Sequence, residues 1–256
     1  MKKIIIIFVI LIISLQASAG RNETIIANAE EAYENRKFDV ALTEYTKLLN
    51  DNVINSDLFY NIGNCYFRLD KLGLAVLYYK KSLLLDPGNE SAFKNLSLAL
   101  SMTKDKQSVE SSDFISKVAK NIFGMLSLNI LAVIILILIF LAVLNVNLML
   151  LKYRNREKTV PVFWLFITLT FLIVFIFLAY AKNDYIYNSK QGVAIGSVIA
   201  GFSGPGEEFT RVFTIHEGMM FTIMKTEDDW SQIKLENGIG GWIPANQIGR
   251  CAIKTF

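Results

Sequence analysis

The sequence contains few of the residues that build metal and redox centres. Among 256 residues it has one histidine, His216, and two cysteines, Cys65 and Cys251, with no Cys-x-x-Cys pair. A zinc cluster therefore has no ligand set, and a disulfide is disfavoured because the two cysteines fall in different segments. We expect Cys65 to be a small buried side chain in a helix and Cys251 to lie near a frayed end. For His216 we expect a hydrogen bond within a turn rather than a part in catalysis.

Catalytic signatures are also missing. The stretch GFSGP from Gly201 lacks the Gly-x-Ser-x-Gly spacing of a nucleophile elbow, and the chain has neither a Walker loop nor a His-Glu-x-x-His pair. We therefore expect no enzymatic activity, no cofactor and no metal. The net charge of +3 is small and its cations are scattered, which argues against nucleic acid as a partner.

Charged residues are scarce as well, at 19%, whereas 53% of the residues are hydrophobic and the mean hydropathy is +0.39. Soluble domains are usually less apolar, so part of the chain should lie in lipid. Residues 128–151 are apolar apart from three asparagines, and residues 160–180 form a second apolar run. Each run is long enough to cross a bilayer, and Trp164 and Tyr180 suit its interfaces. Neither run carries a charge, which argues against a transporter.

The N-terminal residues 1–19 have the pattern of a secretory signal peptide. Lys2 and Lys3 precede an apolar run, and Ala17-Ser18-Ala19 has the small-x-small form that signal peptidase accepts. An uncleaved anchor is the weaker alternative, because the run is only about twelve residues and a span needs about twenty. The sequence thus predicts a mature chain that begins at Gly20, outside the cytoplasm.

The loop between the two apolar runs, residues 152–159, predicts the orientation in the membrane. It holds four cations, Lys152, Arg154, Arg156 and Lys158. Short loops rich in Lys and Arg stay in the cytoplasm, so both flanking parts of the chain should be outside. The signal peptide independently indicates the same side. We therefore expect a bacterial inner-membrane protein with two spans, periplasmic N- and C-terminal domains, and a linker or juxtamembrane helix at 104–127.

Residues 20–103 repeat themselves with a period of 34. The spacing joins Ala41 to Ala75 and Tyr45 to Tyr79, and it also joins Ile25, Phe59 and Phe93. The clearest unit is 56–89, with Gly63 and Ala75 where two helices should approach closely and Pro87 at its end. These residues resemble the tetratricopeptide repeat, with units at 22–55 and 56–89 and a capping helix at 90–103. An ordinary pair of helical hairpins is the alternative.

The resemblance to tetratricopeptide repeats implies an all-α scaffold whose first helices line a concave, partner-binding face. On the repeat's pattern the residues of this face are Glu30, Tyr33, Tyr60, Asn64, Phe67, Lys94 and Asn95. Asn64 and Asn95 occupy positions that hold a peptide carboxylate in clamp-type repeats, but Tyr60 stands where such a clamp has lysine. The alternative is that the aromatic residues only pack against neighbouring helices.

From about Lys190 the pattern changes to short alternating strands with an Asn237-Gly238 hairpin turn. Residues 190–256 resemble a bacterial SH3 domain in four places, namely the turn at 203–206, the turn at 216–218, Trp230 and the closing residues 241–244. The resemblance implies a small all-β barrel of five or so strands. Trp230 is either a ligand platform or a cover for the barrel, and Trp242 should line the core.

The whole arrangement makes a multidomain membrane protein with repeats, two transmembrane helices and an SH3-like barrel. It resembles the BatE family, repeat proteins encoded in Bacteroides aerotolerance operons. That resemblance implies an adaptor that acts with other membrane proteins, the von Willebrand factor A-domain Bat proteins, and with a MoxR-type ATPase. The alternative is a cell-wall sensor or anchor whose barrel binds peptidoglycan.

Overall fold

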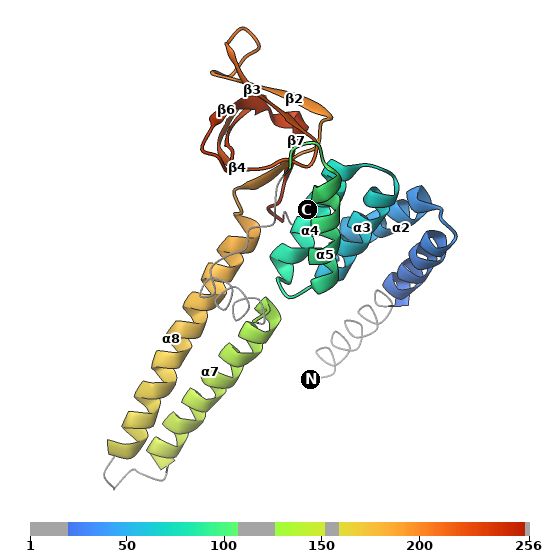
Figure 1. Ribbon diagram of the computed structural model, residues 1–256. Coiled ribbons are helices and arrows are strands. Elements are labelled where there is room, and N and C mark those ends of the chain that lie inside the picture. The colour runs from blue at the N-terminus through green and yellow to red at the C-terminus, as the bar shows by residue number, and fades with distance from the viewer. Residues whose placement is uncertain (1–19, 107–125, 152–158, 254–256) are drawn as a thin grey trace. The chain divides into compact units, whose positions relative to one another are not determined.

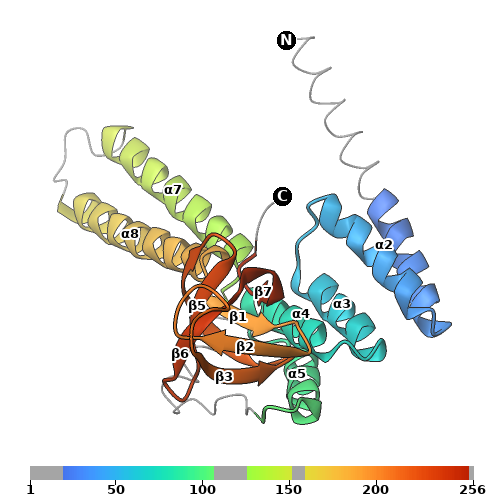
Figure 2. The same ribbon diagram turned by 90° about the horizontal axis from the view of Figure 1, so that it is seen from above.

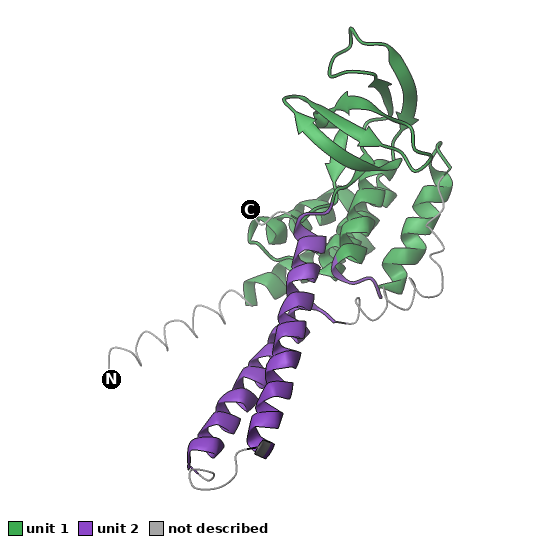
Figure 3. Ribbon diagram, turned by 90° about the vertical axis from the view of Figure 1, so that its left-hand side faces the viewer, with its two compact units in different colours: residues 1–84, 89–110, 190–256 green, residues 85–88, 111–189 purple. Residues whose placement is uncertain are grey.

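The computed structural model describes residues 20–106, 126–151 and 159–253. The signal peptide at 1–19, most of the 104–127 linker and nearly all of the basic loop at 152–159 lie outside the described residues. The chain divides into two compact units (Figure 3). One combines residues from 1–84, 89–110 and 190–256, and the other comprises 85–88 and 111–189.

The repeat region consists of helices that recur every 34 residues (Figure 1). Residues 20–34 are helical. They are followed by α2 (Phe38–Asn50), α3 (Ser56–Arg68), α4 (Leu72–Leu85) and α5 (Glu90–Met102). The N-terminal caps share this spacing, since the Asn55 side chain accepts a hydrogen bond from the Leu58 amide and the Asn89 side chain accepts one from the Ala92 amide. The turns between the two helices of each repeat have the same 34-residue spacing, because Arg36 and Asp70 both have a φ of 57°.

Small residues let the repeat helices approach one another closely. Ala29, Ala41 and Ala75 are fully buried, and a Cβ atom on Gly63 would lie 2.7 Å from ring carbons of Tyr79. Phe93 continues the 34-residue spacing but is 47% exposed, since within the described residues no further repeat helix follows α5. The period therefore predicts the helices better than it predicts burial at the end of the array.

The second unit contains the two candidate membrane helices, α7 (Leu128–Leu151) and α8 (Thr159–Tyr187), which lie side by side. At 1.5 Å per residue, the 24 residues of α7 exceed the roughly 30 Å of a bilayer's hydrocarbon core. The second span was expected to end at residue 180, but the helix continues to Tyr187. Most of their apolar side chains are exposed and very few are buried, as expected for helices that face lipid.

The C-terminal region is an antiparallel sheet of seven strands, rather than the five or so expected (Figure 2). The strands are β1 (Gln191–Ala194), β2 (Val198–Phe202), β3 (Arg211–His216), β4 (Met220–Glu227), β5 (Trp230–Lys234), β6 (Gly240–Pro244) and β7 (Ile248–Arg250). Their order is β3-β2-β6-β5-β4-β1-β7. Ile199, Ile215, Ile233 and Ile243 fill its core. The predicted hairpin turn joins β5 to β6, with Gly238 at a φ of 86°.

Repeats and barrel share one hydrophobic cluster within their unit. Val193 of β1 and Cys251, just after β7, pack with Ala75, Val76 and Leu77 of α4 and with residues of α5. Cys251 is thus 1% exposed, and the expectation that it lies near a frayed end is wrong. The reason is that the segment after β7 is covered by the repeat helices.

Two polar contacts accompany this shared cluster. The Glu217 carboxylate accepts a hydrogen bond of 3.1 Å from the Gly73 amide in the first turn of α4, where the helix dipole favours a negative charge. The Asp105 carboxylate accepts the His216 amide hydrogen at 2.6 Å and lies 3.1 Å from its Nδ1. His216 also keeps the hydrogen bond expected within its turn, since its carbonyl accepts from the Met219 amide at 3.2 Å.

Candidate binding surfaces of the repeats and the barrel

Three of the predicted concave-face residues are joined by hydrogen bonds between α3 and α5. The Asn95 amide donates to Asn64 Oδ1 at 2.8 Å and approaches the Tyr60 hydroxyl at 3.4 Å. Asn64 Oδ1 also accepts the hydroxyl hydrogen of the buried Tyr79 at 2.8 Å. The carbonyl of Asn64 is therefore occupied inside the protein, and its amide nitrogen is the group left for a ligand.

A hollow of about 180 Å³ opens beside this network. Three predicted residues line it, Glu30, Tyr33 and Asn64. Three others were missed at the sequence level, namely Glu34, Tyr45 and Asn61. The helical spacing offered a signal for two of them, since Glu34 lies one turn after Glu30 and Asn61 lies three residues before Asn64.

Tyr45 is the buried part of this hollow. Its side chain is 3% exposed, and it makes no hydrogen bond to any described residue. Burial, and then the nearby Cys65, Glu30 and Tyr33, raise the pKa of Tyr45 above its ordinary value. The hydroxyl therefore stays protonated at neutral pH and lies near the Glu30 carboxylate.

The remaining predicted residues of the face lie away from the hollow. Phe67 is half-buried and packs against the cluster shared with the barrel, so its ring acts in packing. Lys94 is exposed and its ammonium lies 3.4 Å from the Glu90 carboxylate on the same helix. The six residues that line the hollow include no Lys or Arg, so they offer no cation for a peptide carboxylate.

On the barrel, Trp230 is half-buried and its ring meets Phe202 edge to face, with centroids 5.6 Å apart and planes at 85°. The indole is thus held in contact with Phe202 while the side chain keeps contact with solvent. Trp242 is buried, as expected, and the Lys225 ammonium lies 4.9 Å from its ring centroid. Trp230 is therefore the tryptophan of this barrel that a ligand can reach.

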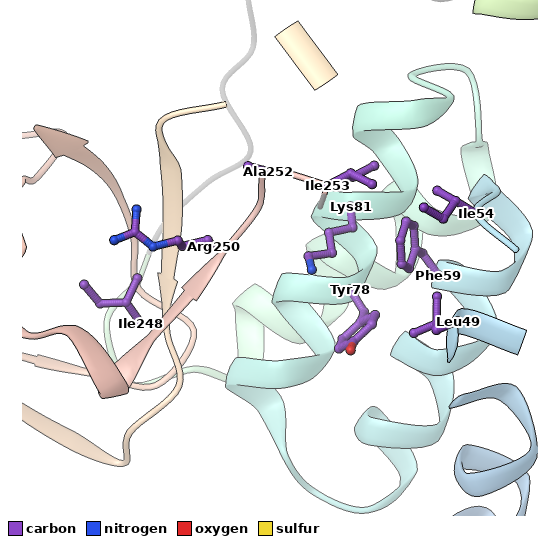
Figure 4. Close-up of a pocket in the computed structure, with 9 residues that line it drawn as sticks. All are labelled: Leu49, Ile54, Phe59, Tyr78, Lys81, Ile248, Arg250, Ala252 and Ile253. Carbon is purple, nitrogen blue, oxygen red and sulfur yellow. The ribbon is translucent and has the colours of Figure 1, made fainter. Parts of the chain in front are cut away.

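A second cavity, of about 280 Å³, lies between the repeat helices and the segment around β7 (Figure 4). Its helical side is apolar except for the Tyr78 hydroxyl and Lys81, whose ammonium stands over the rings of Tyr78 and Phe59 at 5.4 and 5.8 Å. On the other side, Arg250 directs its guanidinium away from the helices (Figure 4) and donates to Thr226 Oγ1 at 2.6 Å. This cavity borders the shared cluster, which it touches through Tyr78, and presents few polar groups.

Metal and thiol chemistry find no support in the part of the chain that the structure describes. No three His, Cys, Asp or Glu side chains gather there to hold a metal ion. Both cysteines are free and buried, as the position of Cys65 in a helix predicted. Burial raises the pKa of Cys65 to about 12 and that of Cys251 to about 11, so neither forms a reactive thiolate at neutral pH.

The comparisons agree with this assignment of two interaction modules. Residues 56–89 match the tetratricopeptide repeat, and residues 199–249 match the bacterial SH3 domain. A search of curated proteins gave no match. The chain thus combines a repeat module typical of protein–protein interaction with a barrel module typical of cell-wall binding, and both are non-catalytic interaction modules.

Proposed function

We propose that this chain is an adaptor of the bacterial inner membrane whose repeats hold a partner protein. The observation that carries the proposal is the hollow beside α3, whose six lining residues are all polar and include Glu30, Glu34 and Asn61, which make no side-chain hydrogen bond to other described residues. A row of amides and hydroxyls on the first helices of a repeat array suits the backbone of an extended peptide.

The partner follows from the resemblance to the BatE family. It would be a membrane protein with a von Willebrand factor A domain, acting with a MoxR-type ATPase in a stress or aerotolerance complex. Two helices long enough to span a bilayer support the membrane anchor. The signal peptide and the basic loop at 152–159 support an orientation with repeats and barrel in the periplasm.

A bulky substitution in the hollow tests this proposal. Asn61 is half-exposed and makes no hydrogen bond to another described residue, so Asn61→Arg should fill the hollow without disturbing the helices. Asn64→Ala is a poorer choice, because it would remove the acceptor of the buried Tyr79 hydroxyl. We expect Asn61→Arg to lower recovery of the von Willebrand factor A-domain partner by about tenfold or more in pull-downs from native membranes.

The matched control is Asn28→Arg, the same change at an exposed position of the helix at 20–34 that does not line the hollow. Its recovery of the partner should equal that of the wild type at matched expression. Equal recovery with Asn61→Arg would exclude this face as the docking site.

A second candidate function, binding of peptidoglycan, is favoured by the barrel. The match to the bacterial SH3 domain and the accessible ring of Trp230, supported by Phe202, are the observations behind it. Aromatic rings supply contact area at low entropic cost. In this function the repeats would be secondary.

Sedimentation with purified peptidoglycan tests this candidate on the full chain in detergent. Wild-type protein should pellet and Trp230→Ala should not. Ile239→Ala serves as the control, because Ile239 is an exposed apolar residue of the same barrel. If Trp230→Ala pellets as well as the wild type, Trp230 does not bind the cell wall.

A further inference from the structure

The hollow beside α3 contains two carboxylates that no cation of the described chain neutralises. Glu30 and Glu34 lie one turn apart on the same helix, so their carboxylates lie on one face. Both are exposed and neither makes an ion pair or hydrogen bond with another described residue. Arg68 donates to the hydroxyl of Tyr33, a lining residue, at 3.4 Å, and its guanidinium lies 6.0 Å from the Phe38 ring centroid, but it forms no ion pair with Glu30 or Glu34.

The floor of the hollow offers a second, independent sign of a missing ligand. The Tyr45 side chain is only 3% exposed, lines the hollow and makes no hydrogen bond to any described residue. Its oxygen is not one of the buried polar atoms that lack a partner, so the hydroxyl opens onto the hollow and can bond to water or to a ligand there. Asn61 adds an amide without a partner among the described residues, and Asn64 adds its amide nitrogen.

The size of the hollow limits what can enter it. A volume of about 180 Å³ equals roughly six water molecules at about 30 Å³ each. Pockets for cofactors and other small ligands are larger, at about 300 Å³ and above. One long side chain of a bound peptide fits this space.

From this charge and size we infer that the hollow is a specificity pocket for an arginine side chain of the partner. A guanidinium can form paired hydrogen bonds with the carboxylates of Glu30 and Glu34. It can also donate to the Tyr45 hydroxyl and lie against the Tyr33 ring. Lysine has the same charge but a single donor group, so it binds there more weakly. The inference rests on the proposed function, since it assigns a recognition element to the face that docks a partner.

Selection from two peptide libraries tests the pocket directly. The full chain in lipid nanodiscs is offered an equimolar mixture of octapeptides with both ends blocked, with either arginine or its neutral analogue citrulline at position four. Charge-assisted hydrogen bonds predict enrichment of the arginine library by about tenfold or more. Equal recovery of the two libraries, or recovery of neither, would overturn the inference.

Variants of the chain show whether these carboxylates are responsible. Glu30→Gln combined with Glu34→Gln should abolish the preference for arginine, and Tyr45→Phe should reduce it without lowering the melting temperature. Glu31→Gln is the matched control, because Glu31 is an exposed neighbour on the same helix outside the hollow. Arginine selection that survives the double change overturns the inference.

The two proposals fail in different ways. If Asn61→Arg loses the membrane partner but arginine and citrulline peptides bind alike, the face docks a partner and the arginine pocket is wrong. If Asn61→Arg retains the partner, the docking face itself is wrong.

Discussion

The contact between Gly63 and Tyr79 allows one substitution to be worked out in detail. In Gly63→Ala the new methyl group would lie 2.7 Å from two ring carbons of Tyr79 and 3.3 Å from a third. Carbon atoms in contact prefer about 3.5–4.0 Å, so the ring must move by nearly 1 Å. It is fully buried, and its hydroxyl is held by Asn64 at 2.8 Å.

Three contributions set the expected change in the free energy of unfolding. Overpacking costs about 1–3 kcal/mol, and loss of the Tyr79 hydrogen bond costs about 1 kcal/mol. Alanine recovers about 1 kcal/mol through its higher helix propensity. The net destabilisation is thus about 1–3 kcal/mol, which for a unit of this size lowers the melting temperature by roughly 2–12 °C.

Thermal melting of the full chain, followed by circular dichroism at 222 nm, measures this loss. Tyr79→Phe provides the companion variant, because it frees the ring from Asn64 while keeping its volume. The double variant should be more stable than the sum of the two single changes predicts, since the freed ring can shift. A melting temperature for Gly63→Ala equal to or above that of the wild type would refute the close contact.

Three further predictions concern the shared cluster, the thiols and the membrane. Gly73→Ala would place a methyl group 2.6 Å from a carbonyl oxygen of the barrel backbone and so loosen the packing that covers Cys251. Under native conditions, Cys251 of this variant should therefore react with a thiol reagent faster than Cys251 of the wild type. An unchanged rate would contradict this packing. Burial raises the pKa of Cys65 to about 12 and that of Cys251 to about 11, so the folded state keeps protons that unfolded thiols release above about pH 8.5. The free energy of unfolding should therefore decrease as the pH rises from about 9 to 11, by at most about 1.4 kcal/mol per pH unit for each thiol. Replacing both Cys65 and Cys251 by alanine should make this pH dependence weaker, as measured by urea unfolding between pH 8.5 and 10. Alkaline phosphatase should be active when it is fused after Phe256, in the periplasm, and inactive when it is fused after Arg156, in the cytoplasmic loop. The reverse pattern would overturn the periplasmic orientation.

The repeat helices could be predicted from the sequence because their signals are local. The 34-residue spacing sets helix pairs, and Asn55 and Asn89 cap successive first helices at that spacing. The strands of the barrel were harder to count. β1 and β7 have only 4 and 3 residues, and the burial of β1 does not alternate. Short buried strands of this kind lack the period of two that marks a half-exposed strand.

The contact between repeats and barrel could not be predicted, because it depends on the shapes of two folded surfaces. Gly73 and Gly249 allow the close approach, but in the sequence they look like ordinary helix and strand residues. The same holds for the hollow, where the sequence marked Tyr45 only by its 34-residue spacing to Tyr79. Its place in the lining of the hollow emerges only when the neighbouring helices are packed around it.

The shared cluster also determines the order in which the chain can mature. Its two halves are far apart in the sequence, since Val193 follows Leu77 by 116 residues, which a ribosome needs about 6–23 s to add at about 5–20 residues per second. Throughout that interval Val76 and Leu77 of the nascent repeats lack the packing contacts that Val193 and Cys251 supply in the folded protein. A chain interrupted after the second candidate span would keep this apolar patch uncovered permanently, and so would present to proteases and chaperones a mark that distinguishes it from a finished protein.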